Sequence, residues 1–291
     1  LKTVSKFKTS VSLALAFVLN AVILIERRKS MEDQMDKKAL RGQVTQVISI
    51  AESLFHNQIL GIYLYGSATM GGLRPDSDID ILIIITQDMS GHIRDNLTKQ
   101  LLTVSGSVGC VEKRPLEVTV ISHNNIVPWN FPPKCEYMYG EWLREEMEAG
   151  KSPQPCYDPD IAILLWQARK TSVTLRGIKS TKLLPSISFH EIKQAIQSSL
   201  SALISSFEGD ERNVLLTLSR MWYTLETEEI ASKDIAAEWV LPQLPETLSA
   251  PLKIAKEAYL GNLSDEWKNT NKNTLALIEF IKCRIEGYYT V

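Results

Sequence analysis

A glycine–serine pair and two closely spaced aspartates lie in one stretch, LYGSATMGGLRPDSDIDILIIIT, residues 64–86. Gly66 and Ser67 follow a short apolar run, and Asp78 and Asp80 open a run of aliphatic residues. Because side chains alternate along a strand, the two aspartates project from one face, whereas the intervening isoleucines point into apolar packing. Neighbouring carboxylates repel each other unless a cation joins them. This stretch therefore predicts a site for a divalent metal ion.

A third acidic residue, Glu117, lies in a later alternating segment, 116–122. It could be a third metal ligand, or a general base that takes a proton from an attacking hydroxyl. Gly66 lets the backbone turn tightly, and the amides that follow it could hold phosphate oxygens, with Ser67 adding a hydroxyl donor. A metal ion on the two aspartates would bridge phosphate oxygens and neutralise charge as pyrophosphate leaves. Together these residues resemble the pattern of the nucleotidyltransferase fold.

The elements that would position these residues alternate between helix and strand. Apolar residues at helical spacing predict two helices, 37–56 and 92–103. Short apolar or alternating runs predict three strands, 59–65, 79–86 and 116–122. Prolines follow, and another helix is expected over 139–149. The first half of the chain is therefore expected to be a mixed α/β domain.

The character of the sequence changes after a proline-rich linker over 151–159. Strand patterns nearly vanish, and helical spacing recurs in six segments: 161–174, 189–207, 214–228, 235–241, 252–260 and 275–289. The first half resembles the polymerase-beta-like nucleotidyltransferases. We therefore expect an α/β nucleotidyltransferase domain over 31–157. We expect an all-α helical bundle domain over 158–291.

Composition narrows the class of protein. The chain has 291 residues and a formal net charge of −2, so it lacks the basic excess typical of nucleic-acid binders. We expect neither a nucleic acid nor a membrane as its partner. The chain has 4 cysteines, and they form no CxxC pair, which indicates reduced thiols in the cytoplasm and no zinc framework. We expect a monomer.

The first thirty residues do not resemble the rest of the chain. Lysines precede an apolar run over 11–25, and a charged cluster follows it. The run has the shape of a signal peptide without an evident cleavage site, and it is short for a membrane span. We expect residues 1–30 to lie outside the functional enzyme, as translation upstream of a start at Met31, with an N-terminal anchor as the alternative.

A wider resemblance extends from about residue 40 to the C-terminus. Its segments occur in order as LYGSATMGGLRPDSDIDILI, LEVTVI, PWNFPP, YGEWLREE, GDERNVLLTLSRMWYTL, SKDIAAEWVLPQLP and AYLG. Together they resemble the aminoglycoside (3'')(9) adenylyltransferases, the streptomycin and spectinomycin resistance enzymes. Several of these segments lie outside the nucleotidyltransferase core, so the resemblance favours this subfamily.

The resemblance implies a reaction and a set of site residues. Family members transfer AMP from ATP to a drug hydroxyl, that is, the 3'' position of streptomycin or the 9 position of spectinomycin, and release pyrophosphate. It implies that Asp78 and Asp80 bind Mg²⁺ and that Glu117 is the catalytic base. The residues matching ATP contacts are Gly66, Ser67, Arg220, Lys233 and Tyr259. Those matching drug contacts are Glu117, Trp142 and Asp210.

Several of these residues also have plainer explanations. Trp142 could be a core residue of an amphipathic helix, and Asp210 could simply cap the helix that follows it. Arg220 and Lys233 could be surface charges, and Tyr259 could pack at a helix end. One position departs from the family pattern. Members that modify streptomycin commonly have an acid four residues before the position matched by Asp210, where this chain has Ser206, and the departure bears more on streptomycin than on spectinomycin.

Two other functions compete with drug adenylylation. One is a nucleotidyltransferase that modifies a protein or a tRNA, although the net charge gives an RNA acceptor no support. The other is a catalytically silent domain that binds a nucleotide and regulates a partner. A degenerate domain should lose a metal ligand or the base, whereas Asp78, Asp80 and Glu117 are all present.

Overall fold

A mixed β-sheet forms the centre of the first half of the chain. The structure is a computed structural model that describes residues 40–71, 73–74, 76–107, 110, 112–267 and 271–289. Within these residues the sheet has the strand order β5-β3-β2-β1-β7. The strands are β1 (Ile59–Leu64), β2 (Ile79–Ile85), β3 (Leu116–Ser122), β5 (Tyr137–Tyr139) and β7 (Val173–Gly177). Only β2 and β3 pair in parallel; the other neighbours are antiparallel.

Strands β2 and β3 are almost completely buried because both faces of the sheet are covered. In β2 and in β3, every residue is buried except the second, which is half-buried. Side chains of alternate residues lie on one face of a strand. One face carries Tyr63, Leu82, Ile84 and Ile121, which pack in a hydrophobic core with α4 (Asp160–Thr171). The isoleucines at odd positions of β2 are buried on the other face, as the sequence predicts.

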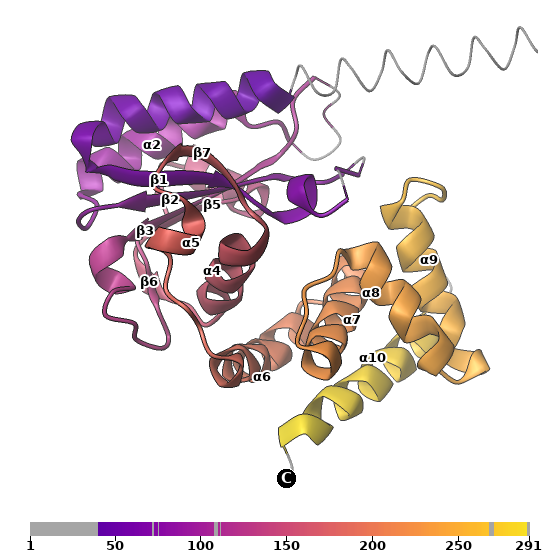
Figure 1. Cartoon of the computed structure of the whole chain (residues 1–291). Coiled ribbons are helices and arrows are strands. Elements are labelled where there is room, and N and C mark those ends of the chain that lie inside the picture. Colours follow the sequence, from indigo (N-terminus) through magenta and orange to yellow (C-terminus); the bar gives the residue numbers. More distant parts are fainter. Residues whose placement is uncertain are drawn as a thin grey trace, which may run out of the picture. The chain divides into compact units, whose positions relative to one another are not determined.

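Helices cover both faces of this sheet. Residues 40–55 form one helix, and α2 (Gly91–Val104) forms another, which begins where the Ser90 side chain accepts from the Ile93 backbone N–H. Figure 1 shows α2 on one side of the sheet and α4 with the short α5 (Ser180–Leu183) on the other. A separate ribbon joins β4 (Lys134–Cys135) to β6 (Cys156–Tyr157). The mixed α/β domain predicted from the sequence is confirmed.

The second half of the chain is mainly helical. It contains α6 (Phe189–Ser205), α7 (Glu211–Thr227), α8 (Lys233–Val240), α9 (Ser249–Tyr259) and α10 (Asn271–Glu286). Figure 1 shows these helices packed together. Trp222 of α7 lies at their centre, with Trp239 and Phe280 edge-on to its ring at 5.5 and 6.3 Å. The helices expected from periodicity are confirmed, because their apolar stripes face this shared core.

Two local predictions were wrong. The helix expected over 161–174 ends at Thr171, and the next residues form β7, which extends the sheet at the edge of β1. The expected helix over 139–149 begins later, because Tyr139 belongs to β5; a 3₁₀ turn over Glu141–Leu143 and a short helix, α3 (Arg144–Glu148), follow. In both places pairing with an existing strand overrides the local pattern.

The predicted domain boundaries remain predictions, and β7 shows that residues after 158 also contribute to the sheet. Contacts divide the chain into residues 1–46 and one larger unit, residues 47–291, and the site described below lies in the larger unit. The predictions for residues 1–30 fall outside the described residues. No helix among the described residues is long and apolar enough to cross a membrane.

Candidate active site

Two of the predicted site carboxylates lie side by side at the start of the parallel strands. The register of β2 and β3 places Asp80 opposite Glu117. These two residues are the half-buried second positions of strands that are otherwise buried. By alternation they share the sheet face of Leu82 and Ile121, which looks towards α4 and the helical half. The sheet therefore presents two adjacent acids on one face.

Glu117 has an unusually high proton affinity for a carboxyl group. Burial, followed by the negative charge of Asp78, raises the pKa of Glu117 to about 7. A hydrogen bond from the Tyr65 hydroxyl to Glu117 Oε1, 3.2 Å long, lowers this pKa, as do the charges of Lys233 and Arg220. A carboxylate that titrates near neutral pH is suited to accept a proton from a substrate and release it afterwards.

The two aspartates also hold their protons more tightly than usual. Burial, then repulsion from Glu117 and Asp78, raises the pKa of Asp80 well above its ordinary value. Burial raises the pKa of Asp78 too, with Glu141 adding repulsion. Hard oxygen donors whose negative charges repel each other suit a divalent cation, which would relieve that repulsion.

The metal donors of this site come as a pair. Among the described residues, no group of three or more His, Cys, Asp or Glu side chains gathers as a metal site. Ions such as Mg²⁺ are commonly held by one or two carboxylates together with substrate phosphates and water. The residues present therefore fit a divalent cation that a phosphorylated substrate helps to bind, and they fit less well a cation caged by the protein alone.

Gly66 lies against Asp80 in a conformation that excludes other residues. Its φ is +65°, and a Cβ added there would lie 1.8 Å from Asp80 Oδ2. Glycine is therefore required both by the backbone and by the carboxylate. Gly66 opens a single 3₁₀ turn, Gly66–Thr69. A hydrogen bond from the Ser67 backbone N–H lowers the pKa of Asp80, so this amide faces the acidic cluster.

The helical half brings two cations to the acids. Burial lowers the pKa of Arg220 and of Lys233, while attraction to the carboxylates opposes this in both. Lys233 Nζ donates to Asn213 Oδ1 at 2.6 Å, and Arg220 donates to Gln167 Oε1 at 3.5 Å. In the part of the chain that the structure describes, neither cation forms an ion pair with an acid of the site. Two half-buried positive charges thus remain free of carboxylate partners, and neither is an exposed surface charge.

Tyr259 lies beside this cluster at the end of α9. It packs against the hydrophobic core, so the plainer explanation of Tyr259 holds in part. Burial raises the pKa of its hydroxyl, while a hydrogen bond with Ser77 lowers it. Because Ser77 directly precedes Asp78, Tyr259 reaches the approach to the aspartate pair.

Ion pairs join that approach to the helical half. Arg74 pairs with Asp234 of α8 at 2.6 Å, and Asp76 pairs with Arg212 of α7 at 2.7 Å. These residues flank the turn that leads into Asp78. The aspartate pair is therefore held from both sides, by the sheet and by the helices.

Trp142 stands out from the surface near the acids. Its side chain is 59% exposed, so the alternative that it is a core residue was wrong. The ring lies over Gly140, where an added Cβ would meet the Trp142 ring at 2.2 Å. Its neighbour Glu141 adds to the negative charge around Asp78. An exposed ring beside an acidic cluster is suited to contact a cationic ligand.

Asp210 is also exposed, and it does not act as an ordinary cap. It occupies the N-cap position of α7, but its side chain makes no capping hydrogen bond. Its carboxylate instead accepts from Asn213 Nδ2 at 3.0 Å, and Asn213 in turn holds Lys233. The predicted drug-side acid is thus connected to the predicted ATP-side lysine through one amide.

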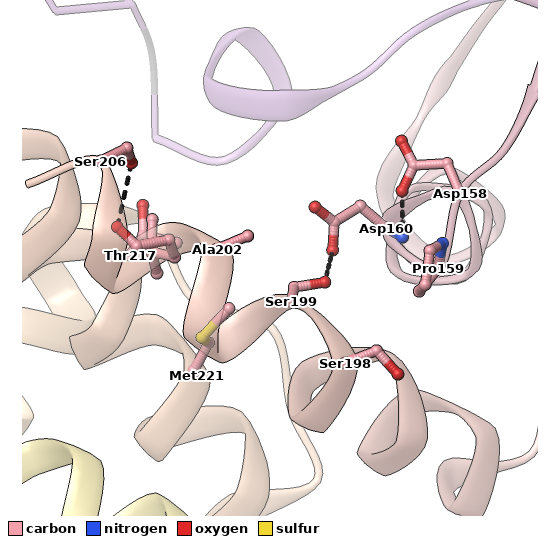
Figure 2. A pocket seen from close by; sticks show the side chains of 10 residues that line it. Asp158, Pro159, Asp160, Ser198, Ser199, Ala202, Ser206, Thr217 and Met221 are labelled. Carbon is pink, nitrogen blue, oxygen red and sulfur yellow. Dashed lines mark hydrogen bonds between the residues drawn. The ribbon is translucent and has the colours of Figure 1, made fainter.

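A cavity of about 420 Å³ opens between the start of α4 and helices α6 and α7. Figure 2 shows Asp160, which accepts a hydrogen bond from Ser199, and, apart from them, Ser206 at the end of α6, which also lines the cavity. The position that departs from the family pattern therefore faces this cavity. The ten lining residues include none of the predicted site residues, so the chemistry lies elsewhere.

Two family models match the chain. Residues 46–127 match the nucleotidyltransferase domain of the polymerase beta family, and residues 182–284 match the C-terminal domain of aminoglycoside adenylyltransferases. The first match includes Gly66, Asp80 and Glu117. The second includes Asp210 and Lys233.

Similar proteins define the family more precisely. A spectinomycin 9-adenylyltransferase from Campylobacter jejuni is 69% identical over 244 residues, which are 84% of this chain and 95% of the relative. The chain belongs to the spectinomycin and aminoglycoside (3'')(9) adenylyltransferase family. A spectinomycin 9-adenylyltransferase from Staphylococcus aureus is 47% identical over 246 residues, 84% of this chain and 95% of the relative. An aminoglycoside (3'') (9) adenylyltransferase from Escherichia coli is 37% identical, covering 84% and 94%.

A solved member of the adenylyltransferase family has the same fold. The crystal structure of the spectinomycin adenyltransferase AAD(9) from Enterococcus faecialis, with ATP and spectinomycin, superposes with a TM-score of 0.81. It is 34% identical and covers 84% of this chain and 99% of its own. The predicted fold, a polymerase-beta-like nucleotidyltransferase domain followed by a helical domain, is confirmed, and so is membership of an enzyme family.

The structure adds two residues to the candidate site that the sequence analysis missed. Tyr65 contacts Glu117, and Asn213 contacts Lys233. Both partners are distant in the sequence, so no local spacing connects them. A weak signal existed for Tyr65 alone, since it directly precedes Gly66 at the end of a predicted strand.

Proposed function

We propose that the protein transfers AMP from ATP to the 9-hydroxyl of spectinomycin, and to the 3''-hydroxyl of streptomycin as a second acceptor, releasing pyrophosphate. The observation that carries the proposal is the meeting of Asp80 and Glu117 with Lys233 and Arg220. Acids that can hold a metal and accept a proton lie beside cations that can hold phosphates. The adenylyltransferase family supports ATP as the nucleotide, and its spectinomycin members favour that drug.

A divalent metal accompanies ATP in this chemistry, and we assign Mg²⁺ to Asp78 and Asp80. Bound there, the ion would supply positive charge that neutralises the phosphates as pyrophosphate leaves. The assignment is supported by the oxygen donors and by the raised pKa values of both carboxyl groups.

ATP would lie between the sheet and the helical half. Lys233 and Arg220 supply positive charge for its phosphates, and Ser67 adds a hydroxyl donor after the tight turn at Gly66. Tyr259 would contact the nucleotide from the end of α9. This assignment is supported by the position of all five residues around the aspartate pair.

Glu117 would act as the general base. The acceptor hydroxyl gives its proton to the Glu117 carboxylate, its oxygen bonds to the α-phosphorus, and the bond from that phosphorus to pyrophosphate breaks. Most of the catalysis is positioning and charge neutralisation. A raised pKa keeps Glu117 basic enough to take the proton.

The acceptor would bind across an acidic, partly aromatic surface. Trp142 and Asp210 are both exposed, and Glu117 would meet the acceptor hydroxyl in this proposal. Aminoglycosides and aminocyclitols are cationic, so carboxylates and an exposed ring suit them. We expect the enzyme to act as a cytoplasmic monomer.

Pyrophosphate release tests the proposal directly. Purified protein with Mg²⁺ and ATP should release pyrophosphate with spectinomycin, release some with streptomycin, and release little with neither. If well-folded protein releases none with either drug, the proposal is wrong. In that event, nucleotide incorporation into cell protein or tRNA would indicate the other acceptor classes, and ATP binding without turnover would indicate a silent regulator.

A further inference from the structure

Tyr65 is a buried tyrosine whose hydroxyl points at the proposed base. It follows β1 directly, and its side chain is 4% exposed. The hydroxyl donates to Glu117 Oε1 at 3.2 Å. At its other end, the Tyr65 backbone N–H donates to the Asp80 carbonyl oxygen at 3.1 Å. Tyr65 is thus hydrogen-bonded to both strands that carry the acids, through its backbone to β2 and through its side chain to β3.

We propose that Tyr65 is a positioning residue that holds one oxygen of the Glu117 carboxylate, so that the other oxygen faces the acceptor hydroxyl. The inference rests on the proposed function, because it assumes that Glu117 is the base. A glutamate side chain has several rotatable bonds, and an anchor on one oxygen limits the directions in which the other can point.

Packing alone does not explain a tyrosine here. A buried phenylalanine would fill the same apolar space, whereas a buried hydroxyl destabilises the fold unless it finds a partner. The partner is the acid of the site, 52 residues further along the chain. Thr119, on the same face of β3 as Glu117, also lies near this hydroxyl.

Tyr65 supplies a donor and takes no part in proton transfer. Burial, followed by the charges of Glu117 and Asp80, raises the pKa of its hydroxyl well above the ordinary value. The hydroxyl therefore keeps its proton throughout the working range of an enzyme, and the acceptor's proton goes to Glu117 only.

The first test replaces Tyr65 by Phe in the full chain. With Mg²⁺, ATP and spectinomycin, we expect kcat to fall about 10- to 100-fold, while KM for ATP and for spectinomycin changes less than about twofold. A defect confined to kcat indicates a lost orientation of the base, since general loosening of the site would also raise KM.

A matched control exists two residues earlier, within β1. Tyr63 is also buried, and its hydroxyl donates to the Ile178 carbonyl oxygen at 2.5 Å, away from the acids. Tyr63→Phe removes the same atom from the same sheet and should retain the wild-type kcat. An equal loss of kcat in both variants would show that either buried hydroxyl acts through the fold, and would overturn the inference.

A double-mutant cycle separates positioning from structure. Glu117→Asp shortens the side chain and withdraws its carboxylate from Tyr65. In that background Tyr65→Phe should reduce kcat less than about twofold, because the contact is already lost. Losses of equal size in both backgrounds would contradict the inference, as would wild-type kcat in Tyr65→Phe. A Tyr65→Phe chain that does not fold would also contradict it, by making the hydroxyl a structural requirement.

The wild-type assay separates a failure of the proposed function from a failure of the role proposed for Tyr65. If wild-type protein releases no drug-dependent pyrophosphate, the proposed function fails and the role of Tyr65 fails with it. If wild-type protein is active and Tyr65→Phe matches it, the role of Tyr65 alone is wrong.

Discussion

At the scale of single residues, the site depends on two neighbouring carboxyl groups, Asp80 and Glu117, whose charged forms are disfavoured by burial and by mutual repulsion. Asp80 and Glu117 are register partners, so their charges repel across the sheet, and burial removes the water that would screen them. Arg220 and Lys233 offset part of that repulsion from the helical half. Raised pKa values with a specific cause are typical of functional sites.

The role of Glu117 can be tested by removing its charge alone. Glu117→Gln keeps the shape of the side chain but cannot accept a proton. We expect ATP affinity to stay within about twofold of wild type and AMP transfer to fall at least about 100-fold. Calorimetry with ATP and the pyrophosphate assay measure the two quantities. Full activity in this variant would remove Glu117 as the base.

The role of Trp142 can be tested by comparing the two drugs. Trp142→Ala removes an exposed ring that supports little of the core, so stability should change little. We expect kcat/KM for streptomycin to fall about tenfold and for spectinomycin less. Tyr157→Phe, a conservative change at another exposed aromatic residue, serves as the control. Equal losses for both drugs would point to a packing role for Trp142.

At the scale of elements, the site is assembled from a sheet and a set of helices that meet at the aspartate turn. The sheet supplies Asp80 and Glu117, and α8 begins at Lys233. Helix α7 orients that lysine through Asn213, whose Oδ1 accepts from Lys233 Nζ at 2.6 Å. The side chain of Asn213, on α7, therefore fixes the position of the Lys233 ammonium group at the start of α8, which the proposal assigns to the ATP phosphates.

Replacing Asn213 tests this connection. Asn213→Ala removes the acceptor that holds Lys233 and frees Asp210 from its amide donor. We expect KM for ATP to rise about three- to tenfold, because the ammonium loses its fixed position. Asn262→Ala, at an exposed asparagine whose side-chain amide donates to Glu257 at 2.7 Å, should leave KM for ATP unchanged. An unchanged KM in Asn213→Ala would show that Lys233 needs no support from α7.

At the scale of the whole molecule, the acidic site lowers the stability of the ligand-free protein. Burial raises the pKa of Glu117 from 4.5 to about 7, so the folded state binds its proton more tightly than the unfolded state. The associated stability is fully present below pH 4.5 and is lost as the pH rises to about 7. Function and stability therefore oppose each other at this residue.

Thermal unfolding should measure the stability that the Glu117 carboxylate costs the folded protein. Without ligands at pH 8, Glu117→Gln should raise the free energy of unfolding by about 1–3 kcal/mol and Tm by a few degrees. The difference should shrink as the pH falls from about 7 and should vanish well below 4.5, where the wild-type carboxyl is protonated in both states. Glu238→Gln, at an exposed position of α8, serves as the control. A Glu117→Gln protein that is less stable than wild type at pH 8 would contradict the prediction.

The sequence by itself determined the local elements and the chemistry. Alternation and apolar runs place β1, β2 and β3 within a residue of their observed ends, because a strand buried on a face must repeat every second residue. The same alternation predicts that Asp78 and Asp80 project to one side. Helical periodicity likewise predicts most of the second half, since each helix must bury one stripe.

Only the tertiary structure decided which distant residues meet. The parallel register of β2 and β3 sets Glu117 beside Asp80, and the order of strands brings Tyr65 to the same acid. Strand β7 forms because the edge of β1 offers unpaired backbone groups. The sequence of that segment does not predict this pairing. Spacing along the chain predicts neighbours within one element, whereas contacts between elements depend on register and packing, which the whole core decides at once.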